Sequence, residues 1–227
     1  MKNRGVLISF IGIDGSGKTT LANTLNMTMK EYGIRSKYIY GRFTSVILKI
    51  LVEITKKLLS FRGKNMSVYD ERVIIKNQIL RSRVVSRIYQ SYVFLNYISQ
   101  IFIKVNLPLM FNKNIVCDRY VYDSVVDLAI DFHYTGERLR GVLSQYLRFV
   151  PRPDCTFLID LPEDIAFRRG KEDIPSVAFL SDRRGIYLEM SKWYEMTILD
   201  GEKDLQELRE IVKSAVFTKS FHKGKVT

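Results

Sequence analysis

Short apolar runs rich in β-branched residues alternate along the chain with segments whose apolar residues recur every three or four positions. The first pattern predicts buried strands, and the second predicts amphipathic helices. Strands that alternate with helices predict an α/β fold, in which a parallel sheet of about five strands carries helices on both faces. The expected strands are residues 6–11, 36–40, 114–117, 155–160 and 196–199.

The helical segments differ in their polar faces. Residues 46–59 combine an apolar face with a basic one, which fits packing on the body of the protein, on a second subunit or on a membrane surface. Residues 69–107 form a long helical pattern, and Pro108 marks the region where it is expected to end. Other helices are expected at residues 20–32, 122–132, 137–149, 181–194 and 202–216. The charged stretch at 168–173 is expected to be a mobile loop.

A glycine-rich stretch follows the first predicted strand. Residues 12–19 are Gly-Ile-Asp-Gly-Ser-Gly-Lys-Thr, which matches every fixed position of the phosphate-binding pattern of two glycines, a lysine and a hydroxyl residue. The stretch lies between a predicted strand and a predicted helix, as the pattern requires. It therefore predicts a three-layer sandwich of the phosphate-loop (P-loop) NTPase type.

The residue types of this loop fit the phosphates of a nucleotide. Glycine adopts positive φ angles without strain, so successive N–H groups can point into one anion site at a helix N-terminus. Lys18 is expected to reach the terminal phosphates, and the Thr19 hydroxyl is expected to ligate a bridging magnesium ion. ATP and Mg²⁺ are the predicted cofactors. The predicted nucleotide-binding residues are Gly12, Asp14, Gly15, Ser16, Gly17, Lys18, Thr19 and Thr20.

Other charged residues follow predicted strands or share a helix face. Arg42 follows the second strand, where parallel sheets bind ligands, and is either a phosphate contact or a solvated loop residue. Asp118 ends the third strand and is the best candidate beside the loop for holding magnesium, directly or through water. Arg119 would bring positive charge to a transferred phosphoryl group. Arg83 and Arg87 share a helix face that either lines an anionic pocket or is solvated.

Composition restricts the class of protein. A chain of 227 residues with 46% hydrophobic residues predicts one globular domain, which we expect over residues 1–218, followed by a basic tail at 219–227. The net charge of +12 favours polyphosphates, nucleic acid or acidic membranes without selecting among them. Cys117 and Cys155 lie in or beside apolar strands, which fits buried thiols in a reducing compartment.

Two segments bear on the location of the protein. Residues 1–4 lead into the first strand without a signal-peptide pattern. Residues 93–111 are strongly apolar, but polar residues interrupt them, so they are expected to fall short of a transmembrane helix. The predicted location is cytoplasmic.

The motifs, in their order, resemble those of the thymidylate kinase family of nucleoside monophosphate kinases. The resemblance extends from Leu7 to about Val216. It rests on the phosphate loop, Asp118-Arg119-Tyr120 with Ser124 after it, residues 153–162, Arg168-Arg169 and Tyr187-Leu188. It implies magnesium-dependent transfer of the γ-phosphoryl group from ATP to a nucleoside monophosphate, dTMP in the family's namesake. It also suggests a homodimer that forms through helices.

The same resemblance implies roles for individual residues. Asp14 matches the residue that contacts the sugar of the acceptor, and Arg119 matches the one that contacts its phosphate. Gly15 occupies a place where some members carry an arginine, and members without it have catalytic arginines in a lid. The lid is expected at about residues 168–180, with Arg168, Arg169 and Lys171 as its cations. The predicted catalytic residues are Lys18, Arg119, Arg168 and Arg169, and the predicted substrate-binding residues are Asp14, Arg42, Arg83, Arg119 and Ser124.

The sequence departs from the family pattern at two places, which leaves the acceptor open. The usual Arg-Glu-Pro after the second strand is absent, with only Arg42 in its place. The base-reading Ala-Tyr-Gln is replaced by Val126-Asp127-Leu128. One alternative is therefore a kinase for a non-thymine nucleotide, a sugar or a polynucleotide end. Another is a nucleic-acid-binding ATPase or nucleotide switch, which the net charge would suit, although no strand ends in an Asp-Glu pair.

Overall fold

The computed structural model describes residues 4–41, 82–170 and 174–221. Contacts divide the chain into one unit of residues 1–42 and 101–227 and a second unit of residues 43–100. Within the second unit the described residues, 82–100, belong almost wholly to helix α4 (Arg83–Ile101). The helix expected at 46–59 lies outside the described residues, and the extent of the kinase domain over 1–218 stays a prediction.

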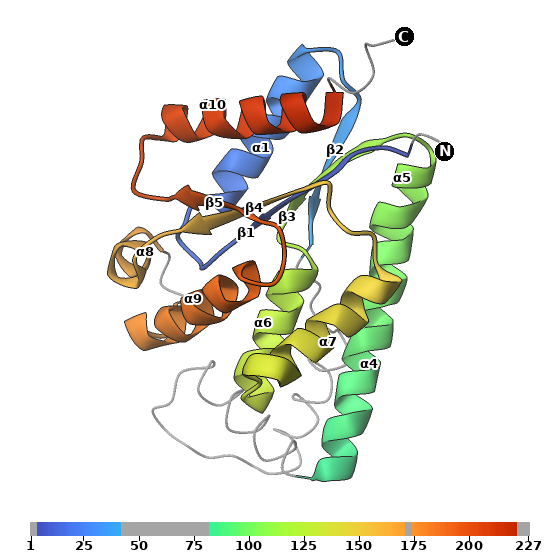
Figure 1. The fold of residues 1–227 in the computed structure, drawn as a ribbon, viewed down its shortest axis with the longest axis vertical. Helices are drawn as coiled ribbons and strands as arrows, with labels where there is room; N and C mark the ends of the chain where they lie inside the picture. Colours follow the sequence, from blue (N-terminus) through green and yellow to red (C-terminus); the bar gives the residue numbers. More distant parts are fainter. Residues whose placement is uncertain (1–3, 42–81, 171–173, 222–227) are drawn as a thin grey trace, which may run out of the picture. The chain divides into compact units, whose positions relative to one another are not determined.

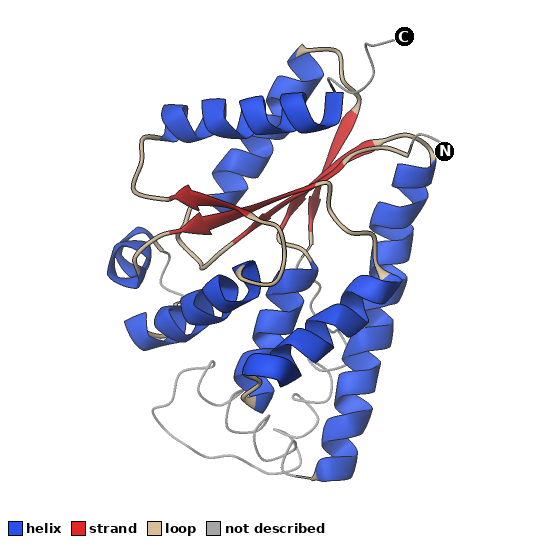
Figure 2. Ribbon diagram, viewed as in Figure 1, coloured by secondary structure: helices blue, strands red, loops and turns tan. Residues whose placement is uncertain are grey.

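A parallel sheet of five strands forms the first unit's core among the described residues (Figures 1 and 2). The strands are β1 (Leu7–Ile11), β2 (Ser36–Tyr40), β3 (Asn114–Asp118), β4 (Cys155–Asp160) and β5 (Thr197–Asp200), in the order β2-β3-β1-β4-β5. Every neighbouring pair is parallel, and Phe10 of β1 lies beside both Asp118 and Phe157. The predicted α/β fold is confirmed. Because β1 and β3 are adjacent and parallel, the loops that follow them emerge at the same edge of the sheet.

Helices cover both faces of this sheet (Figure 2). Helices α1 (Lys18–Glu31) and α10 (Leu205–Val216) lie on one face. Helices α6 (Val121–Phe132), α7 (Gly136–Phe149) and α9 (Val177–Ser191) lie on the other (Figure 1). The short helix α8 (Glu163–Arg169) follows β4 and precedes α9 in the chain.

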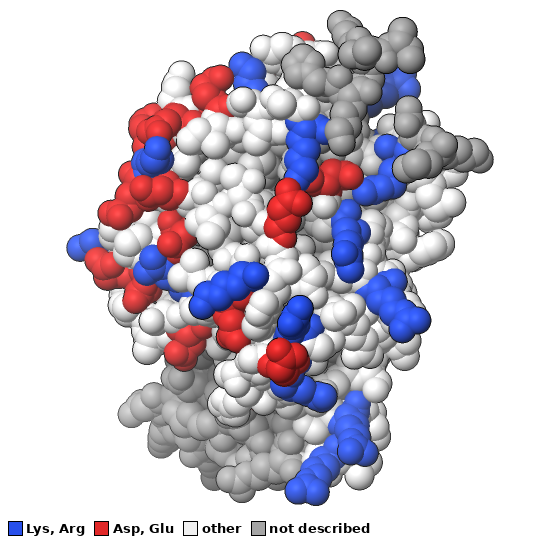
Figure 3. Space-filling view, in the orientation of Figure 1, with Lys and Arg blue, Asp and Glu red and all other residues white. Residues whose placement is uncertain are grey.

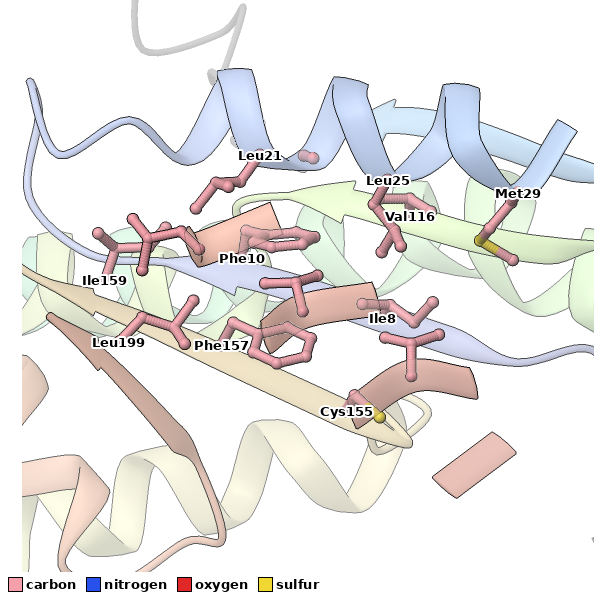
Figure 4. Packing of buried hydrophobic residues seen from close by; sticks show 14 residues of the cluster. Ile8, Phe10, Leu21, Leu25, Met29, Val116, Cys155, Phe157, Ile159 and Leu199 are labelled. Atoms are coloured by element: carbon pink, nitrogen blue, oxygen red, sulfur yellow. The ribbon is translucent and has the colours of Figure 1, made fainter. Parts of the chain in front are cut away.

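The apolar core between the sheet, α1 and α10 anchors the start of the phosphate loop. Alternate residues of a strand face opposite sides of a sheet, so Ile8 and Phe10 of β1 share a face. They belong to a cluster of buried residues that includes Leu25 of α1 (Figure 4). Val212 of α10 belongs to the same cluster. The rings of Phe10 and Phe157 stack with centroids 5.2 Å apart. The loop is thus held between a buried strand and a helix packed on it.

The long apolar helical stretch does not end at Pro108. Helix α4 continues through a π-helical turn (Phe102–Asn106) into α5 (Leu107–Met110), which carries Pro108 in its first turn. A proline inside a continuous helix lacks an N–H donor and crowds the preceding turn, and here the π-helical turn, a departure from α-helical bonding, lies directly before Pro108. By length and composition alone, the stretch Arg83–Met110 could cross a membrane. This is weak evidence for a membrane span, because the core helices of soluble proteins pass the same test.

Two boundaries around the expected lid also differ from prediction. Arg168 and Arg169 form the last turn of α8, although their charge density suggested a mobile loop. Acidic residues begin this helix and basic residues end it, an order that favourably complements the helix dipole. Helix α9 begins at Val177, before the expected residue 181, because the Ser176 side chain caps it by accepting a bond from the Phe179 N–H.

Candidate active site

The phosphate loop has the backbone geometry that its glycines predict. Gly12, Gly15 and Gly17 have φ angles of 138°, 84° and 91°, all in the range that favours glycine. Gly17 is the N-cap of α1, whose first residue is Lys18, and no acidic residue lies in the first turn of this helix. The loop therefore ends at a helix N-terminus that is free to attract an anion.

Gly15 also has a packing reason to lack a side chain. A Cβ atom built on Gly15 would lie 2.2 Å from the carbonyl oxygen of Ala166 in α8. A Cβ on Gly12 would similarly lie 2.6 Å from the carbonyl oxygen of Ile159. The backbone of α8 thus lies directly against the loop. This arrangement has no room at position 15 for the arginine that some family members carry there.

Lys18 is buried and bonded to the loop itself. Its Nζ donates to the carbonyl oxygen of Ile13 and, at 3.3 Å, to Oγ of Ser16. Burial is the main cause that lowers the pKa of Lys18 to about 7, and repulsion from Arg119 adds to it, while nearby carboxylates partly oppose both. Phosphates bound in the loop would restore a full positive charge on this side chain.

Asp118 lies at the end of β3, fully buried, beside the start of α1. Its Oδ2 atom accepts bonds from the Thr19 hydroxyl at 2.6 Å and from the Tyr38 hydroxyl at 2.8 Å. Its Oδ1 atom is buried and has no hydrogen-bond partner among the described residues. A hydroxyl that donates its proton keeps its lone pairs, so Thr19 and Asp118 fit a site for a hard cation. Sequence reasoning identified both residues but missed Tyr38.

No group of three His, Cys, Asp or Glu side chains that could hold a metal ion occurs in the described parts of the chain. A magnesium ion at Thr19 and Asp118 would therefore need oxygen ligands from phosphates and water. That pattern is the usual one for magnesium at nucleotide sites, because this ion keeps several water molecules.

Arg119 follows Asp118 and lies between two carboxylates. Its backbone has a φ of 70°, and its N–H donates to the carbonyl oxygen of Phe10 at 2.9 Å. Nη1 donates to Oδ1 of Asp123 at 3.2 Å, and Nη2 pairs with Asp14. Burial would lower the pKa of Arg119, but these two carboxylates raise it above its ordinary value. The structure therefore brings together Asp14 and Arg119, which sequence reasoning assigned to the acceptor.

Helices α6 and α9 meet through two polar contacts that the sequence did not reveal. Oδ1 of Asp123 accepts a bond from the Tyr187 hydroxyl at 2.7 Å. Four residues further along α6, Asp127 pairs with Arg183 at 2.7 Å. Spacings of four residues on both helices were the only local signal for these contacts, since such residues share a helix face.

Curated relatives decide the family of the chain. "Probable thymidylate kinase 1" of Saccharolobus solfataricus is 30% identical over 212 residues, which are 90% of this chain and 93% of the relative. The chain belongs to the thymidylate kinase family. "Probable thymidylate kinase" of Pyrococcus abyssi is 27% identical over 94% of this chain and 96% of the relative. "Thymidylate kinase" of Fervidobacterium nodosum is 26% identical over 92% and 97%. No family model matches the chain.

Membership in this family makes the protein a thymidylate kinase-like phosphotransferase, with the role of a nucleoside monophosphate kinase. The expected lid arginines are engaged elsewhere in this structure. Arg168 is exposed and pairs with Asp164 one turn earlier, and Nη1 of Arg169 donates to the carbonyl oxygen of Gly201 at 3.1 Å. Their predicted catalytic role stays a prediction.

Another arginine near the end of β4 escaped sequence reasoning. Arg184 of α9 binds both carboxylate oxygens of Asp160, at 2.6 and 3.0 Å, and Oε2 of Glu163 at 2.9 Å. Hydrogen bonding to Asp160 is the main cause that raises the pKa of Arg184, and its bond to Glu163 acts in the same direction. Arg184 therefore ties α9 to the end of β4 and to the start of α8.

The positions of the remaining predicted residues do not test the roles predicted for them. Thr20 is exposed on α1, and Ser124 is half-buried in the first turn of α6 beside Asp123. Arg83 is the first residue of α4, in the second unit. Arg42 and Lys171 lie outside the described residues. The substrate-binding roles of Arg42, Arg83 and Ser124 and the lid role of Lys171 stay predictions.

Proposed function

We propose that this protein is a thymidylate kinase, which transfers the γ-phosphoryl group of ATP to dTMP and yields ADP and dTDP with the help of Mg²⁺. The names of the relatives support the acceptor. The observation that carries the proposal is the grouping of Lys18, the Thr19–Asp118 pair and the Arg119–Asp14 pair at one edge of the sheet. These groups match the needs of a phosphoryl donor, a cation and a phosphorylated acceptor.

In this proposal the phosphate loop and Lys18 bind the β- and γ-phosphates of ATP. Thr19 and Asp118 would hold the magnesium ion, whose chemistry is to neutralise charge on the phosphate oxygens during transfer. Tyr38 keeps Asp118 in place by donating to Oδ2, the oxygen that also accepts from Thr19. The loop and its neighbours thus orient the donor and stabilise its charge rather than react with it.

Arg119 and Asp14 form the proposed acceptor site. In this structure they pair with each other, so a phosphate that binds Arg119 takes the place of the Asp14 carboxylate at Nη2. Asp14 then accepts a bond from a sugar hydroxyl. The exchange keeps the buried guanidinium paired with an anion at each stage, which avoids the cost of an isolated buried charge.

Arg168 and Arg169 are the proposed lid cations. Each would have to leave its present partner, Asp164 or the Gly201 carbonyl, before it could reach a phosphate. A well-placed donor at the transferred group typically contributes on the order of a hundredfold in rate. The homodimer and the cytoplasmic location also stay predictions from the sequence.

The distribution of charge bears on the nucleic-acid alternative. On the face that Figure 3 shows, acidic side chains gather along the left edge, over α8 and the start of α10, while Lys and Arg lie mainly elsewhere. Residues 42–81 hold nine Lys and Arg against three Asp and Glu, which is about half of the net charge of +12. The net charge of the chain therefore does not by itself indicate nucleic-acid binding, which has to be measured directly.

The decisive experiment measures ADP release from Mg-ATP by purified protein with dTMP, dUMP, UMP, CMP, AMP or GMP, and without acceptor. Lys18→Ala serves as the inactive control. Selective turnover of dTMP that depends on Lys18 is the expected result. Turnover of another monophosphate would show that the acceptor is not dTMP. That result would agree with the replacement of the family's base-reading Ala-Tyr-Gln by Val126-Asp127-Leu128. Slow, acceptor-independent hydrolysis with salt-sensitive nucleic-acid binding would instead support the ATPase alternative.

A further inference from the structure

Arg119 has a backbone conformation that needs support from its surroundings. Its φ of 70° lies in the left-handed region, which costs a residue with a side chain on the order of 1 kcal/mol. The N–H bond to Phe10 holds the backbone, and Gly41 passes so close that a Cβ there would lie 2.1 Å from the Arg119 carbonyl oxygen. The start of the side chain is therefore well defined, while the direction of its guanidinium depends on its partners.

Of the two carboxylates that pair with Arg119, Asp123 is the one to which no ligand contact is assigned. Its side chain is 0% exposed, and each of its oxygens is engaged. Oδ1 accepts from Nη1 of Arg119 at 3.2 Å and from the Tyr187 hydroxyl at 2.7 Å, and Oδ2 accepts from the Tyr120 N–H at 3.0 Å. Rotation of this carboxylate would break all three bonds. Asp123 therefore keeps one oxygen in a constant position against Arg119.

Tyr187 controls this carboxylate from another helix. It is 1% exposed, and burial followed by the charge of Asp123 raises its pKa well above the ordinary value, so its hydroxyl is a lasting donor. Helix α9 packs on α6 in an antiparallel register, because position 187 contacts 123 and position 183 contacts 127. A shift of α9 along α6 would separate both pairs at once.

We infer that Asp123 and Tyr187 are positioning residues that aim the Arg119 guanidinium at the phosphate of the acceptor. The inference rests on the proposed function, because it needs Arg119 to bind that phosphate. Asp14 leaves Arg119 when the acceptor binds, so Asp123 is then the remaining carboxylate that orients the guanidinium.

The test compares two conservative substitutions of buried tyrosines. Tyr187→Phe removes the bond to Asp123, whereas Tyr120→Phe removes a bond of 2.9 Å to the carbonyl oxygen of Pro151 and serves as the matched control. For Tyr187→Phe we expect kcat/KM for the acceptor to fall about tenfold, since hydrogen bonds to charged groups are the strong ones. We expect kcat/KM for ATP to change less than about twofold in both variants.

A double-mutant cycle separates positioning from general stability. In an Arg119→Lys background, Tyr187→Phe should lower kcat/KM for the acceptor by less than about twofold, because the guanidinium that it positions is gone. Thermal unfolding of each variant is measured alongside. A lower Tm for Tyr187→Phe with unchanged acceptor kinetics, or equal losses in both backgrounds, would overturn the inference.

Three further outcomes also decide between the possibilities. If Tyr187→Phe fails to fold, Asp123→Asn takes its place. This substitution keeps the size of the side chain but weakens the bond to Arg119. Unchanged acceptor kinetics in the Asp123→Asn variant would refute the role of Asp123. If the wild-type enzyme shows no acceptor-dependent ADP release, the proposed function fails and the inference falls with it. If the wild-type enzyme turns over the acceptor and the Tyr187→Phe variant does so equally well, the positioning role is refuted while the proposed function stands.

Discussion

Lys18 should take up a proton when a nucleotide binds. Its pKa in the free protein is lowered to about 7, because the ammonium is buried and lies near Arg119, while Asp14, Asp123 and Asp118 face it from the other elements and oppose the change. The phosphates of ATP would add negative charge beside the ammonium and raise its pKa toward the ordinary 10.5. Protonation and nucleotide binding are therefore linked.

The size of this linkage follows from the pKa. At pH 8 only about a tenth of Lys18 is protonated in the free protein, so binding should take up about 0.9 proton for each nucleotide. At pH 7 the uptake should be about 0.5 proton. Nucleotide affinity should consequently fall by up to about tenfold between pH 8 and pH 9, where ATP itself no longer titrates.

The same pKa has a consequence for the stability of the free protein. The unfolded chain binds a proton at Lys18 up to about pH 10.5 and the folded chain up to about pH 7, so the unfolded state holds more protons between these values. The contribution of Lys18 to the free energy of unfolding therefore rises with pH through this window. At about 1.4 kcal/mol for each pH unit, the whole rise amounts to about 5 kcal/mol.

Isothermal titration calorimetry in two buffers of different ionisation enthalpy, Tris and HEPES, measures the uptake directly. Lys18→Met should abolish it, and Lys30→Met, a change in the exposed last turn of the same helix, should leave it intact. Equal proton uptake by the wild type and Lys18→Met at pH 8 would show that Lys18 is already charged in the free protein. That result would refute the reasoning from burial.

Two other substitutions test the surroundings of the loop. Gly15→Ala combines a φ of 84° with a contact of 2.2 Å to the Ala166 carbonyl oxygen, so it should lower the free energy of unfolding by about 2 kcal/mol or more in urea titrations. Gly33→Ala has a similar φ of 72° with no atom within 4 Å, and should cost only about 1 kcal/mol. Tyr38→Phe removes a bond to Asp118, so the Mg²⁺ concentration at half-maximal rate should rise about threefold to tenfold, while Tyr32→Phe should not change it.

The sheet and the loop could be predicted because their signals are local. Most of the strands are short apolar runs, and their parallel direction follows from the helices between them. The glycines of the loop needed positive φ angles, and their spacing in the sequence already implied this. Asp118 and Arg119 were found for the same reason, because they follow directly after a strand.

The contacts that orient these residues could not be predicted in this way. Tyr38 lies 80 residues from Asp118 in the sequence, and Tyr187 lies 64 residues from Asp123. Such pairs depend on strand order and on the register between two helices, neither of which leaves a local pattern. The expectation of a loop at Arg168 and Arg169 failed for a different reason: their charges were taken to indicate a loop, although their position suits a helix C-terminus.

The cations of the candidate site bind the protein's own oxygen atoms in this structure. Lys18 donates to the loop, and Arg119 pairs with Asp14 and Asp123. In the proposed function each substrate phosphate therefore replaces an existing bond, and affinity reflects the difference between the old and the new partner. This difference is larger for a dianionic phosphate than for a neutral hydroxyl, since charge-assisted bonds are the stronger ones. Selectivity for phosphorylated ligands thus follows from the contacts that already fill the site.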